Sequence, residues 1–401
     1  MADKVKEILE RSISKIYPSK KSFEDILKSG KKITIYHGID PTGPELHLGH
    51  STNLLLLKRL QEMGHKIILL VGDFTAQIGD PTDKLAVRKS ISEEDVLKNC
   101  ETYKEQAAKI LDFSSKKNPV EMVFNGDWYS KMGAKEFLGI TKKITVQRLL
   151  ERDMFQERIK KGKDITVLEF LYPLMQGYDS VVLKSDVEVG GTDQTFNMLM
   201  GRTLMKRYLG KEKLVITTRL LENPKNGKKL MSKSEGSYIA LTDSSKDMYG
   251  KTMFLPDEVI IDCLEMCTEL PMAEVKKIET NLKKGLNPRD AKARLAREIV
   301  GLYHGSQAAK EAEAEFEKVF AKKEAPSEVP VFKTSKKEYN IVDLLVEAKL
   351  AVSKSEARRL ISQGGVKVGN KKITDQNKLI KITKNILVQV GKRKFLEVTL
   401  R

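Results

Sequence analysis

The residues best suited to chemistry in this sequence are histidines gathered in one short stretch. Four of the five histidines lie between His37 and His65, and two of them, His47 and His50, bracket a Leu-Gly pair where a helix-forming run begins. A helix N-terminus offers backbone N–H groups and a positive dipole end, and imidazoles beside it can donate to phosphate or ribose oxygens. Gly49 has no side chain, which leaves room beside this helix N-terminus for a nucleotide base. The pattern favours a nucleotide site, with a capped helix and a packed histidine as the structural alternative.

A second candidate is a lysine set among small hydroxyl residues in the segment LMSKSEG, at 230–236. A lysine on such a loop can swing a point charge onto phosphate, although a solvated lysine loop has the same composition. The sequence contains neither G-x-x-x-x-G-K-[ST] nor G-x-G-x-x-G, so the two commoner phosphate cradles are absent. The histidine pair and the lysine loop together therefore predict a nucleotide site of another type.

The elements around these residues predict an α/β fold with a doubly wound parallel sheet. A β-rich run at 31–36 ends in turn residues, a helix is expected over 48–63, and a buried strand follows at 66–72. Strand, helix and strand form a βαβ unit, whose ligand is expected at the carboxyl ends of the strands. From about residue 246 the pattern becomes helical, with a helix start at Asn287.

Length and cysteine content narrow the class of protein. A chain of 401 residues is long enough for two or more domains. Its three cysteines are too few for a disulfide framework, which predicts a reducing, cytoplasmic location. The longest apolar run, at 67–71, is too short for a membrane span. The first 18 residues favour an amphipathic helix and lack the apolar core of a signal peptide.

The charge is concentrated towards the C-terminus. The net charge is +17, and residues 336–401 contain 16 basic and 6 acidic residues, a net charge of +10. The segment 324–330 before this basic region has the composition of a linker. A basic module of this kind favours a nucleic-acid partner, because phosphate neutralisation dominates such affinity. An anionic membrane surface is the alternative partner.

Several motifs in the sequence resemble those of a known family. IDPTGPELHLGH (39–50) and LMSKS (230–234) resemble the paired signatures of class I aminoacyl-tRNA synthetases. The segments TIYHGIDPT, LVGDFTAQIGDPT, FLYPLMQGYDS and VGGTDQTFN narrow the resemblance to tyrosyl-tRNA synthetases of the bacterial type. The run at 341–369 is similar to the RNA-binding module of a small ribosomal-subunit protein. The resemblance covers nearly the whole chain.

The resemblance implies a domain organisation. The expected parts are a Rossmann-like catalytic domain at 1–245, with a connective insertion at about 120–185 and a mobile lysine loop at about 225–240; an α-helical anticodon-stem domain at 246–323; a linker at 324–335; and a small α+β RNA-binding domain at 336–401.

The resemblance also implies an activity, that of a ligase joining tyrosine to tRNA in two steps. Tyrosine attacks the α-phosphorus of ATP, and the tyrosyl group of the resulting adenylate passes to the 3′ end of tRNA. A carboxylate is already ionised at neutral pH, so catalysis is expected to depend on alignment and charge stabilisation. The implied partners are tRNA, L-tyrosine, ATP as substrate with its Mg²⁺, and a second copy of the chain through the catalytic domain. No protein-bound metal is predicted.

Matching positions take their implied roles from the family. Tyr36 and Asp179 match the groups that hydrogen-bond the substrate phenol, and a donor–acceptor pair selects a hydroxyl because an analogue without one leaves both groups unpaired. The other tyrosine-binding positions are Asp80, Tyr172, Gln176 and Gln194. The positions expected to act on the phosphates and ribose in the transition state are Thr42, His47, His50, Lys84, Arg88 and Lys233. The ATP-binding positions are Asp40, Gly49, Gly190, Gly191, Asp193, Met231, Ser232, Lys233 and Ser234. The RNA-binding positions are Lys354, Arg358, Arg359 and Lys367.

One departure and three alternatives remain open. The family's loop motif normally begins with lysine, and Leu230 stands in that place, so either Lys229 supplies the charge or activation depends on Lys233. Another nucleotidyl transferase with the same histidine motif would lack the RNA module. A synthetase-like paralogue that only binds RNA is favoured by Leu230 alone. A tryptophanyl synthetase is disfavoured by the phenol pair, Tyr36 and Asp179.

Overall fold

The computed structural model describes residues 2–81, 91–231, 238–321, 329–369, 371–383, 385–391 and 394–400. The chain forms two compact units, Met1–Ala309 and Lys310–Arg401. Among the helices of these described ranges, none has the length and apolar character that a membrane crossing requires.

The first unit is built on a six-stranded sheet. Five neighbouring strands are parallel, which confirms the predicted parallel sheet, and the edge strand β1 is antiparallel to β6. In spatial order the strands are β1 (Ile13–Tyr17), β6 (Leu214–Thr218), β5 (Val187–Gly191), β2 (Thr34–Ile39), β3 (Lys66–Val71) and β4 (Glu121–Phe124).

The predicted βαβ unit is present as β2, α3 (Leu48–Glu62) and β3. β2 begins at Thr34 and not at Lys31, because pairing with β3 starts where Thr34 lies opposite Lys66. The helix predicted over the first 18 residues is wrong in its second half. After α1 (Ala2–Glu10) the chain forms β1, since Ile16 is buried and pairs with Ile216 of β6. Tertiary pairing has overridden the local amphipathic pattern.

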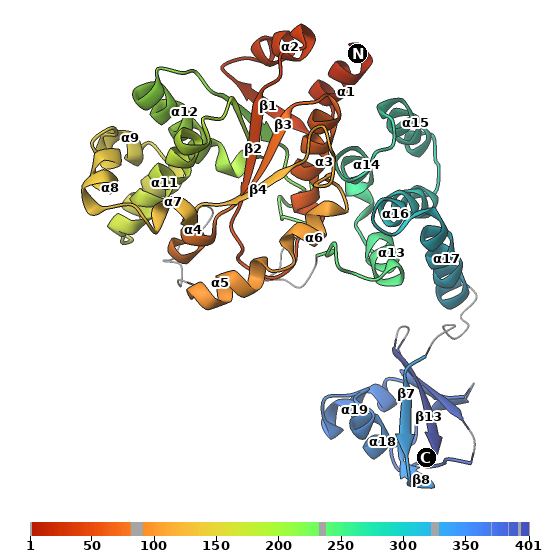
Figure 1. Cartoon of the computed structure of the whole chain (residues 1–401). Coiled ribbons are helices and arrows are strands. Elements are labelled where there is room, and N and C mark those ends of the chain that lie inside the picture. The colour runs from red at the N-terminus through yellow and green to blue at the C-terminus, as the bar shows by residue number, and fades with distance from the viewer. Residues whose placement is uncertain are drawn as a thin grey trace. The chain divides into compact units, whose positions relative to one another are not determined.

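Helices cover both faces of this sheet (Figure 1). α3 lies on one side, and α11 (Val167–Leu183) and α12 (Thr195–Leu209) lie side by side on the other. α11 and α12 approach closely at two glycines, since a Cβ at Gly177 would lie 3.0 Å from the backbone nitrogen of Gly201. The remaining helices before residue 245 are α2 (Lys20–Ser29), α4 (Asp73–Ile78), α5 (Glu93–Cys100), α6 (Tyr103–Ala108), α7 (Gly126–Tyr129), α8 (Ala134–Thr141), α9 (Val146–Leu150), α10 (Asp153–Lys160) and the 3₁₀ turn Thr192–Gln194.

A helical segment follows, as its pattern predicts. α14 packs against α3, and α13 against α16. The helix start predicted at Asn287 is confirmed, because its side chain accepts the backbone N–H of Arg289 ahead of Pro288. The elements are α13 (Ser245–Met253), a 3₁₀ turn (Asp257–Val259), α14 (Ile260–Cys267), α15 (Met272–Lys283), α16 (Pro288–His304), α17 (Ser306–Phe316) and a π-helical turn (Glu317–Ala321).

The second unit has its own core, formed by apolar residues of two helices and the strands they cover. Its main sheet has the order β10-β9-β12-β13-β7, and β11 pairs with β8. Ser353 caps α19, and its hydroxyl accepts from the backbone N–H of Glu356. The elements are β7 (Val331–Thr334), β8 (Glu338–Asn340), α18 (Ile341–Glu347), α19 (Lys354–Ser362), β9 (Val366–Val368), β10 (Lys371–Ile373), β11 (Leu379–Lys381), β12 (Ile386–Val390) and β13 (Lys394–Leu400).

Candidate active site

A cavity of about 370 Å³ opens at the carboxyl ends of β2, β3 and β5, where a ligand is expected in a sheet of this topology. Most of the residues predicted for tyrosine and ATP binding line it together, with two of the residues predicted to be catalytic, Thr42 and His50. They are Tyr36, Asp40, Thr42, Gly49, His50, Asp80, Tyr172, Gln176, Asp179, Gly190, Gly191, Asp193 and Gln194.

The cavity has a buried end, around Tyr36 and Asp179. The Asp179 carboxylate is 2 % exposed and accepts from the Trp128 indole N–H at 3.0 Å and the Asn125 amide at 3.3 Å. Burial raises the pKa of Asp179, and these donors oppose that rise. Sequence reasoning missed Asn125 and Trp128, because neither residue type points to a role without its partner.

A second buried network holds Tyr36. Its hydroxyl lies 2.7 Å from the Ser180 hydroxyl, and the Lys213 ammonium donates to Ser180 Oγ at 2.7 Å. Lys213 forms an ion pair with Glu188, whose carboxylate accepts from the Gln176 amide at 3.1 Å. Burial raises the pKa of Tyr36 well above its usual value, and the carboxylates of Glu188 and Asp179 act in the same direction. Sequence reasoning missed Ser180, Glu188 and Lys213.

The middle of the cavity is organised by Asp40. Its carboxylate accepts from the Tyr172 hydroxyl at 2.8 Å and from the Thr75 hydroxyl at 2.8 Å. Gly72 leaves the space for this carboxylate, because a Cβ there would lie 2.0 Å from Asp40 Oδ1. α11 presents Tyr172, Gln176 and Asp179 to the cavity.

Asp80 also lines the cavity. It accepts from the Gln194 amide at 2.7 Å, and the buried Arg152 guanidinium lies 3.4 Å from it. Arg152 comes from the helical segment after β4 and was not predicted. An acidic group that lines the same cavity as Tyr172 and Gln176 is suited to receive a ligand's ammonium group.

His50 lines the cavity at the N-terminus of α3, whereas His47 beside it is not among the lining residues. We call this part of the site, with both residues, the histidine end. His47 is the N-terminal cap of α3 and accepts the backbone N–H of Gly49 at 3.2 Å, while His50 Nδ1 accepts the backbone N–H of His47 at 3.1 Å. The two rings are in contact, with centroids 3.9 Å apart and planes tilted by 36°. Because each Nδ1 accepts, each neutral ring has its proton on Nε2, the atom suited to donate to a ligand oxygen.

The lysine loop lies only partly within the described residues. Lys229 forms an ion pair with Asp193 at 3.1 Å, Met231 is buried, and the backbone N–H of Leu230 donates to Leu221. The pairing with Asp193 places the cation of Lys229 at the edge of the cavity. The predicted residues that lie outside the described ranges are Lys84, Arg88, Ser232, Lys233 and Ser234.

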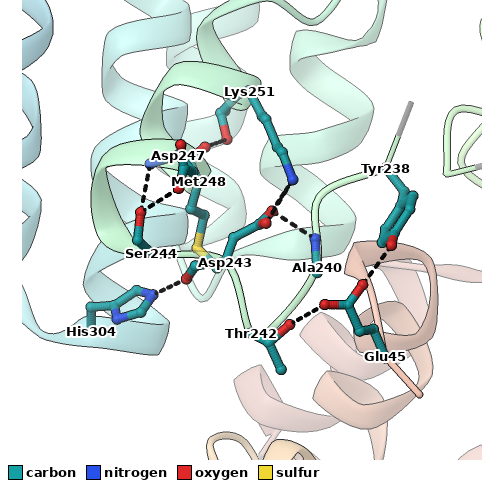
Figure 2. Close-up of polar contacts among 11 residues, drawn as sticks. Glu45, Tyr238, Ala240, Thr242, Asp243, Ser244, Asp247, Met248, Lys251 and His304 are labelled. Carbon is teal, nitrogen blue, oxygen red and sulfur yellow. Dashed lines mark hydrogen bonds and ion pairs between the residues drawn. The ribbon is translucent and has the colours of Figure 1, made fainter. Parts of the chain in front are cut away.

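The segment that follows this loop is bound to the histidine signature, and sequence reasoning missed this anchor. Glu45 accepts from the Tyr238 hydroxyl at 2.5 Å and the Thr242 hydroxyl at 2.8 Å (Figure 2). The backbone N–H groups of Leu48 and Leu241 donate to Ile239 and Leu46. Figure 2 also shows the next contacts towards the helical segment, the Lys251 ammonium on the Asp243 carboxylate and the His304 ring on the Asp243 carbonyl.

The second unit presents the predicted RNA-binding cations on its surface. Lys354, Arg358 and Arg359 lie on α19 and Lys367 lies on β9, and all four are exposed. Lys354 forms an ion pair with Asp343 at 2.7 Å. Across the described ranges of both units, no group of three or more His, Cys, Asp or Glu residues is arranged to hold a metal ion.

Comparisons with known proteins show to which family the chain belongs. Residues 28–321 match the family model described as "tRNA synthetases class I (W and Y)", and residues 321–398 match that of the "Tyrosine--tRNA ligase SYY-like C-terminal domain". The tyrosine–tRNA ligase of Carboxydothermus hydrogenoformans is 45% identical, covering 98% of this chain and 97% of that protein. The ligase of Thermotoga maritima is 44% identical, covering 98% and 96%.

A solved structure agrees as well. The C-terminally truncated mitochondrial tyrosyl-tRNA synthetase of Aspergillus nidulans is 25% identical, with a TM-score of 0.68 over 80% of this chain and 95% of that one. The chain therefore belongs to the class I aminoacyl-tRNA synthetases, in the tyrosyl-tRNA synthetase family.

Proposed function

We propose that this chain is a tyrosine–tRNA ligase, which activates L-tyrosine with ATP and transfers the tyrosyl group to the 3′ end of its tRNA. The proposal rests above all on the buried end of the cavity. There a desolvated carboxylate, Asp179, and a desolvated hydroxyl, Tyr36, both line the wall that the substrate phenol would reach. An aromatic amino acid without a hydroxyl would leave both groups unpaired in a place that water cannot easily fill.

The middle of the cavity suits the amino-acid backbone of the substrate. Asp80, Tyr172 and Gln176 supply carboxylate, hydroxyl and amide oxygens for the ammonium group. Gln194 donates to Asp80 and lies where the substrate carboxylate would emerge. The carboxylate is thereby aimed at the histidine end, where ATP is proposed to bind.

At the histidine end, the α3 N-terminus with His47 and His50 would receive the phosphates and ribose of ATP. Thr42 would reach the leaving pyrophosphate, and Asp40 and Asp193 the ribose or ammonium. Gly49, Gly190 and Gly191 would let the backbone approach the nucleotide. The remaining residues proposed for this end are Met231 and, outside the described ranges, Lys84, Arg88, Ser232, Lys233 and Ser234.

With these residues, catalysis would depend on the alignment of the substrates and on the stabilisation of developing charge. The substrate carboxylate is the nucleophile and needs no general base, so His50 Nε2–H and the lysines would stabilise charge that develops on the phosphates. Mg²⁺ is proposed to enter with ATP, since it prefers phosphate and water ligands to a protein cage. In the second step the terminal ribose hydroxyl of tRNA would displace AMP from the adenylate.

The remaining parts of the chain would handle tRNA. We infer a catalytic domain at 1–245, an anticodon-stem domain at 246–323, a linker at 324–335 and an RNA-binding domain at 336–401. A homodimer through the catalytic domain and a cytoplasmic location complete the proposal. The exposed cations of α19 and β9 support the RNA-binding role, because they form a surface suited to phosphates.

Amino-acid-dependent exchange of labelled pyrophosphate into ATP tests the first step. Exchange is expected with tyrosine and not with phenylalanine or tryptophan, and it should be lost in Lys233→Ala. Exchange with tryptophan in place of tyrosine would contradict the assignment of the phenol pair. Absence of exchange with all three, together with salt-sensitive tRNA binding, would identify an RNA-binding paralogue instead.

The RNA-binding role is tested by the salt dependence of tRNA affinity. Replacing Arg358 and Arg359 with Ala should reduce the slope of log affinity against log salt by about 1 to 2, because each phosphate contact contributes nearly one unit. Replacing Lys21 and Lys28 on α2 removes the same charge from the first unit and should leave the slope unchanged. Equal slopes in both double variants would exclude α19 from the RNA interface.

A further inference from the structure

Lys213 is a charged residue that the proposed mechanism does not use, although it lies directly behind the cavity. Its side chain is fully buried, 5.7 Å from the centroid of the Tyr36 ring. Burying an ammonium group is costly unless it is paired and hydrogen-bonded. Lys213 has both kinds of partner, the Glu188 carboxylate and the Ser180 hydroxyl.

The fold provides a dedicated space for this cluster. In the sheet, Tyr36 lies opposite Glu188 of β5, and Glu188 lies opposite Val215 of β6, two residues after Lys213. Side chains two residues apart on an extended segment share a face, so Lys213 reaches the same face as Tyr36 and Glu188. Gly201 of α12 leaves the room, since a Cβ there would lie 2.4 Å from Lys213 Nζ and 2.6 Å from Ser180 Oγ.

The cluster orients the proton of Ser180. A lysine ammonium can only donate, so Ser180 Oγ accepts from Lys213 at 2.7 Å. The Ser180 proton then has two nearby acceptors, Tyr36 Oη at 2.7 Å and Glu188 Oε2 at 3.5 Å. The shorter distance favours Tyr36. The Glu188 carboxylate is in addition already engaged by Lys213 and Gln176.

A hydroxyl has only one proton, and its direction decides what Tyr36 can bind. If Ser180 donates to Tyr36, then the Tyr36 proton is left to donate into the cavity. If Tyr36 donated to Ser180 instead, its oxygen would offer only lone pairs. In that case both Tyr36 and the Asp179 carboxylate would need a proton from the substrate phenol, which has one.

We propose that Lys213 and Ser180 are positioning residues that direct the Tyr36 proton towards the substrate phenol, in the chain Lys213 to Ser180 to Tyr36 to phenol to Asp179. This rests on the proposed function, in which Tyr36 and Asp179 hold the phenol. Each group in the chain donates to the next, from an ammonium at one end to a carboxylate at the other, and such chains strengthen cooperatively. No bond other than hydrogen bonds forms or breaks.

Ser180→Ala tests the chain with one atom removed. We expect the ratio of kcat/KM for tyrosine to kcat/KM for phenylalanine, measured by pyrophosphate exchange, to fall about tenfold, the worth of one hydrogen bond to a neutral group. The loss should fall on tyrosine, because phenylalanine has no hydroxyl for Tyr36 to bind. If Ser180 had a purely structural role, kcat/KM would fall equally for tyrosine and phenylalanine, and this outcome would overturn the proposal.

Ser185→Ala is the matched control. Ser185 is also a fully buried serine, and within the described chain its hydroxyl has no hydrogen-bond partner. Its substitution should leave the tyrosine-to-phenylalanine ratio unchanged. A fall equal to that in Ser180→Ala would mean that any buried serine in this region matters, and the proposal would be rejected.

A double variant tests the contribution of Lys213. Lys213→Met with Glu188→Gln removes the ion pair without leaving one charge buried, and it should lower the same ratio. An unchanged ratio in the folded double variant would overturn the role of Lys213, and if this variant does not fold, Ser180→Ala alone decides.

Tyr36→Phe separates this proposal from the proposed function. If it leaves discrimination unchanged, the pocket assignment itself fails; if it lowers discrimination and Ser180→Ala does not, only the chain fails.

Discussion

At the buried end of the cavity, the groups proposed to select the substrate are held by other side chains, whereas at the histidine end they are held mainly by backbone. Asp179 is fixed by Trp128 and Asn125, and Tyr36 by Ser180. His47 and His50 are fixed by backbone N–H groups of the first turn of α3. The buried end therefore depends on partners from distant segments, while the histidine end depends on one short stretch.

The difference has an energetic consequence. A buried donor or acceptor that loses its partner suffers the full cost of desolvation, because water cannot replace the partner. At the more exposed histidine end, water can take over part of a lost contact. Substitutions should therefore reduce activity most at the buried end and least at the histidine end. At the buried end they should lower the selectivity for tyrosine, and at the histidine end they should lower kcat/KM for ATP.

The largest effect is expected for Asp179. Asp179→Ala should relax selection for tyrosine far more than it weakens ATP binding. Asp179→Asn keeps the shape, but its NH₂ group must face the phenol or one of the donors, Trp128 and Asn125. We expect the tyrosine-to-phenylalanine ratio in pyrophosphate exchange to fall about a hundredfold, since a charged hydrogen bond is lost. Unchanged discrimination would place the phenol elsewhere.

Gly72→Ala probes the middle of the cavity and should have the next largest effect. Its Cβ would lie 2.0 Å from Asp40 Oδ1 and 2.4 Å from Thr75 Oγ1, so Asp40 must move and release Tyr172. Because such a clash typically costs 1 to 3 kcal/mol, we expect kcat/KM for both tyrosine and ATP to fall about thirtyfold.

The control for Gly72→Ala is Gly139→Ala. Gly139 lies in α8, where an added Cβ would meet nothing within 4 Å in the described structure. This substitution should leave activity unchanged and raise the melting temperature slightly, because Ala favours a helix. If the two alanine variants have equal activity, Asp40 has no part in positioning either substrate.

At the histidine end, Lys229→Met should have a smaller effect that is confined to ATP. The ammonium of Lys229 pairs with Asp193 at 3.1 Å but is 44% exposed, so water partly compensates for its loss. We expect kcat/KM for ATP to fall about fivefold and the KM for tyrosine to stay constant. Lys225→Met removes an exposed lysine paired with Glu258 on the same connection and should change neither value. Equal behaviour of the two variants would leave Lys233 as the lysine on which activation depends.

The contrast between contacts within one short stretch and contacts between distant segments also explains how much of the fold could be predicted from the sequence. β2, α3, β3 and α16 were predictable because each is marked by its own residues, such as Asn287 before Pro288. β1 was not, because its pairing with β6 joins segments about 200 residues apart. A local pattern contains no information about a partner at that distance.

In the candidate site too, residues within local motifs could be predicted and residues brought in by tertiary structure could not. The cavity-lining residues within the signatures, such as His50 and Gly190, were predicted from their motifs. Lys213 was missed, because in a chain with 72 lysines and arginines a single lysine before a strand is expected on the surface. Only the folded chain brings it to Glu188 and Ser180.

The smallest effect is expected where the histidine end meets the segment after the lysine loop. Glu45→Gln weakens two hydrogen bonds, from Tyr238 and Thr242 (Figure 2). The backbone hydrogen bond from Leu48 to Ile239 remains. The end of the loop should be held less firmly, so kcat for pyrophosphate exchange should fall about threefold with the KM for tyrosine unchanged.

Asp247→Asn gives the comparison for that effect. Asp247 accepts from Ser244 at the start of α13, within the same group of polar contacts but without a contact to Glu45 in Figure 2. Its loss should weaken the cap of α13 and lower the melting temperature, leaving kcat unchanged. If Asp247→Asn lowers kcat as much as Glu45→Gln does, stability of the helical segment as a whole controls the loop. If only Glu45→Gln lowers kcat, the direct anchor on the histidine signature controls it, and even the backbone-built end of the cavity depends on one side-chain contact.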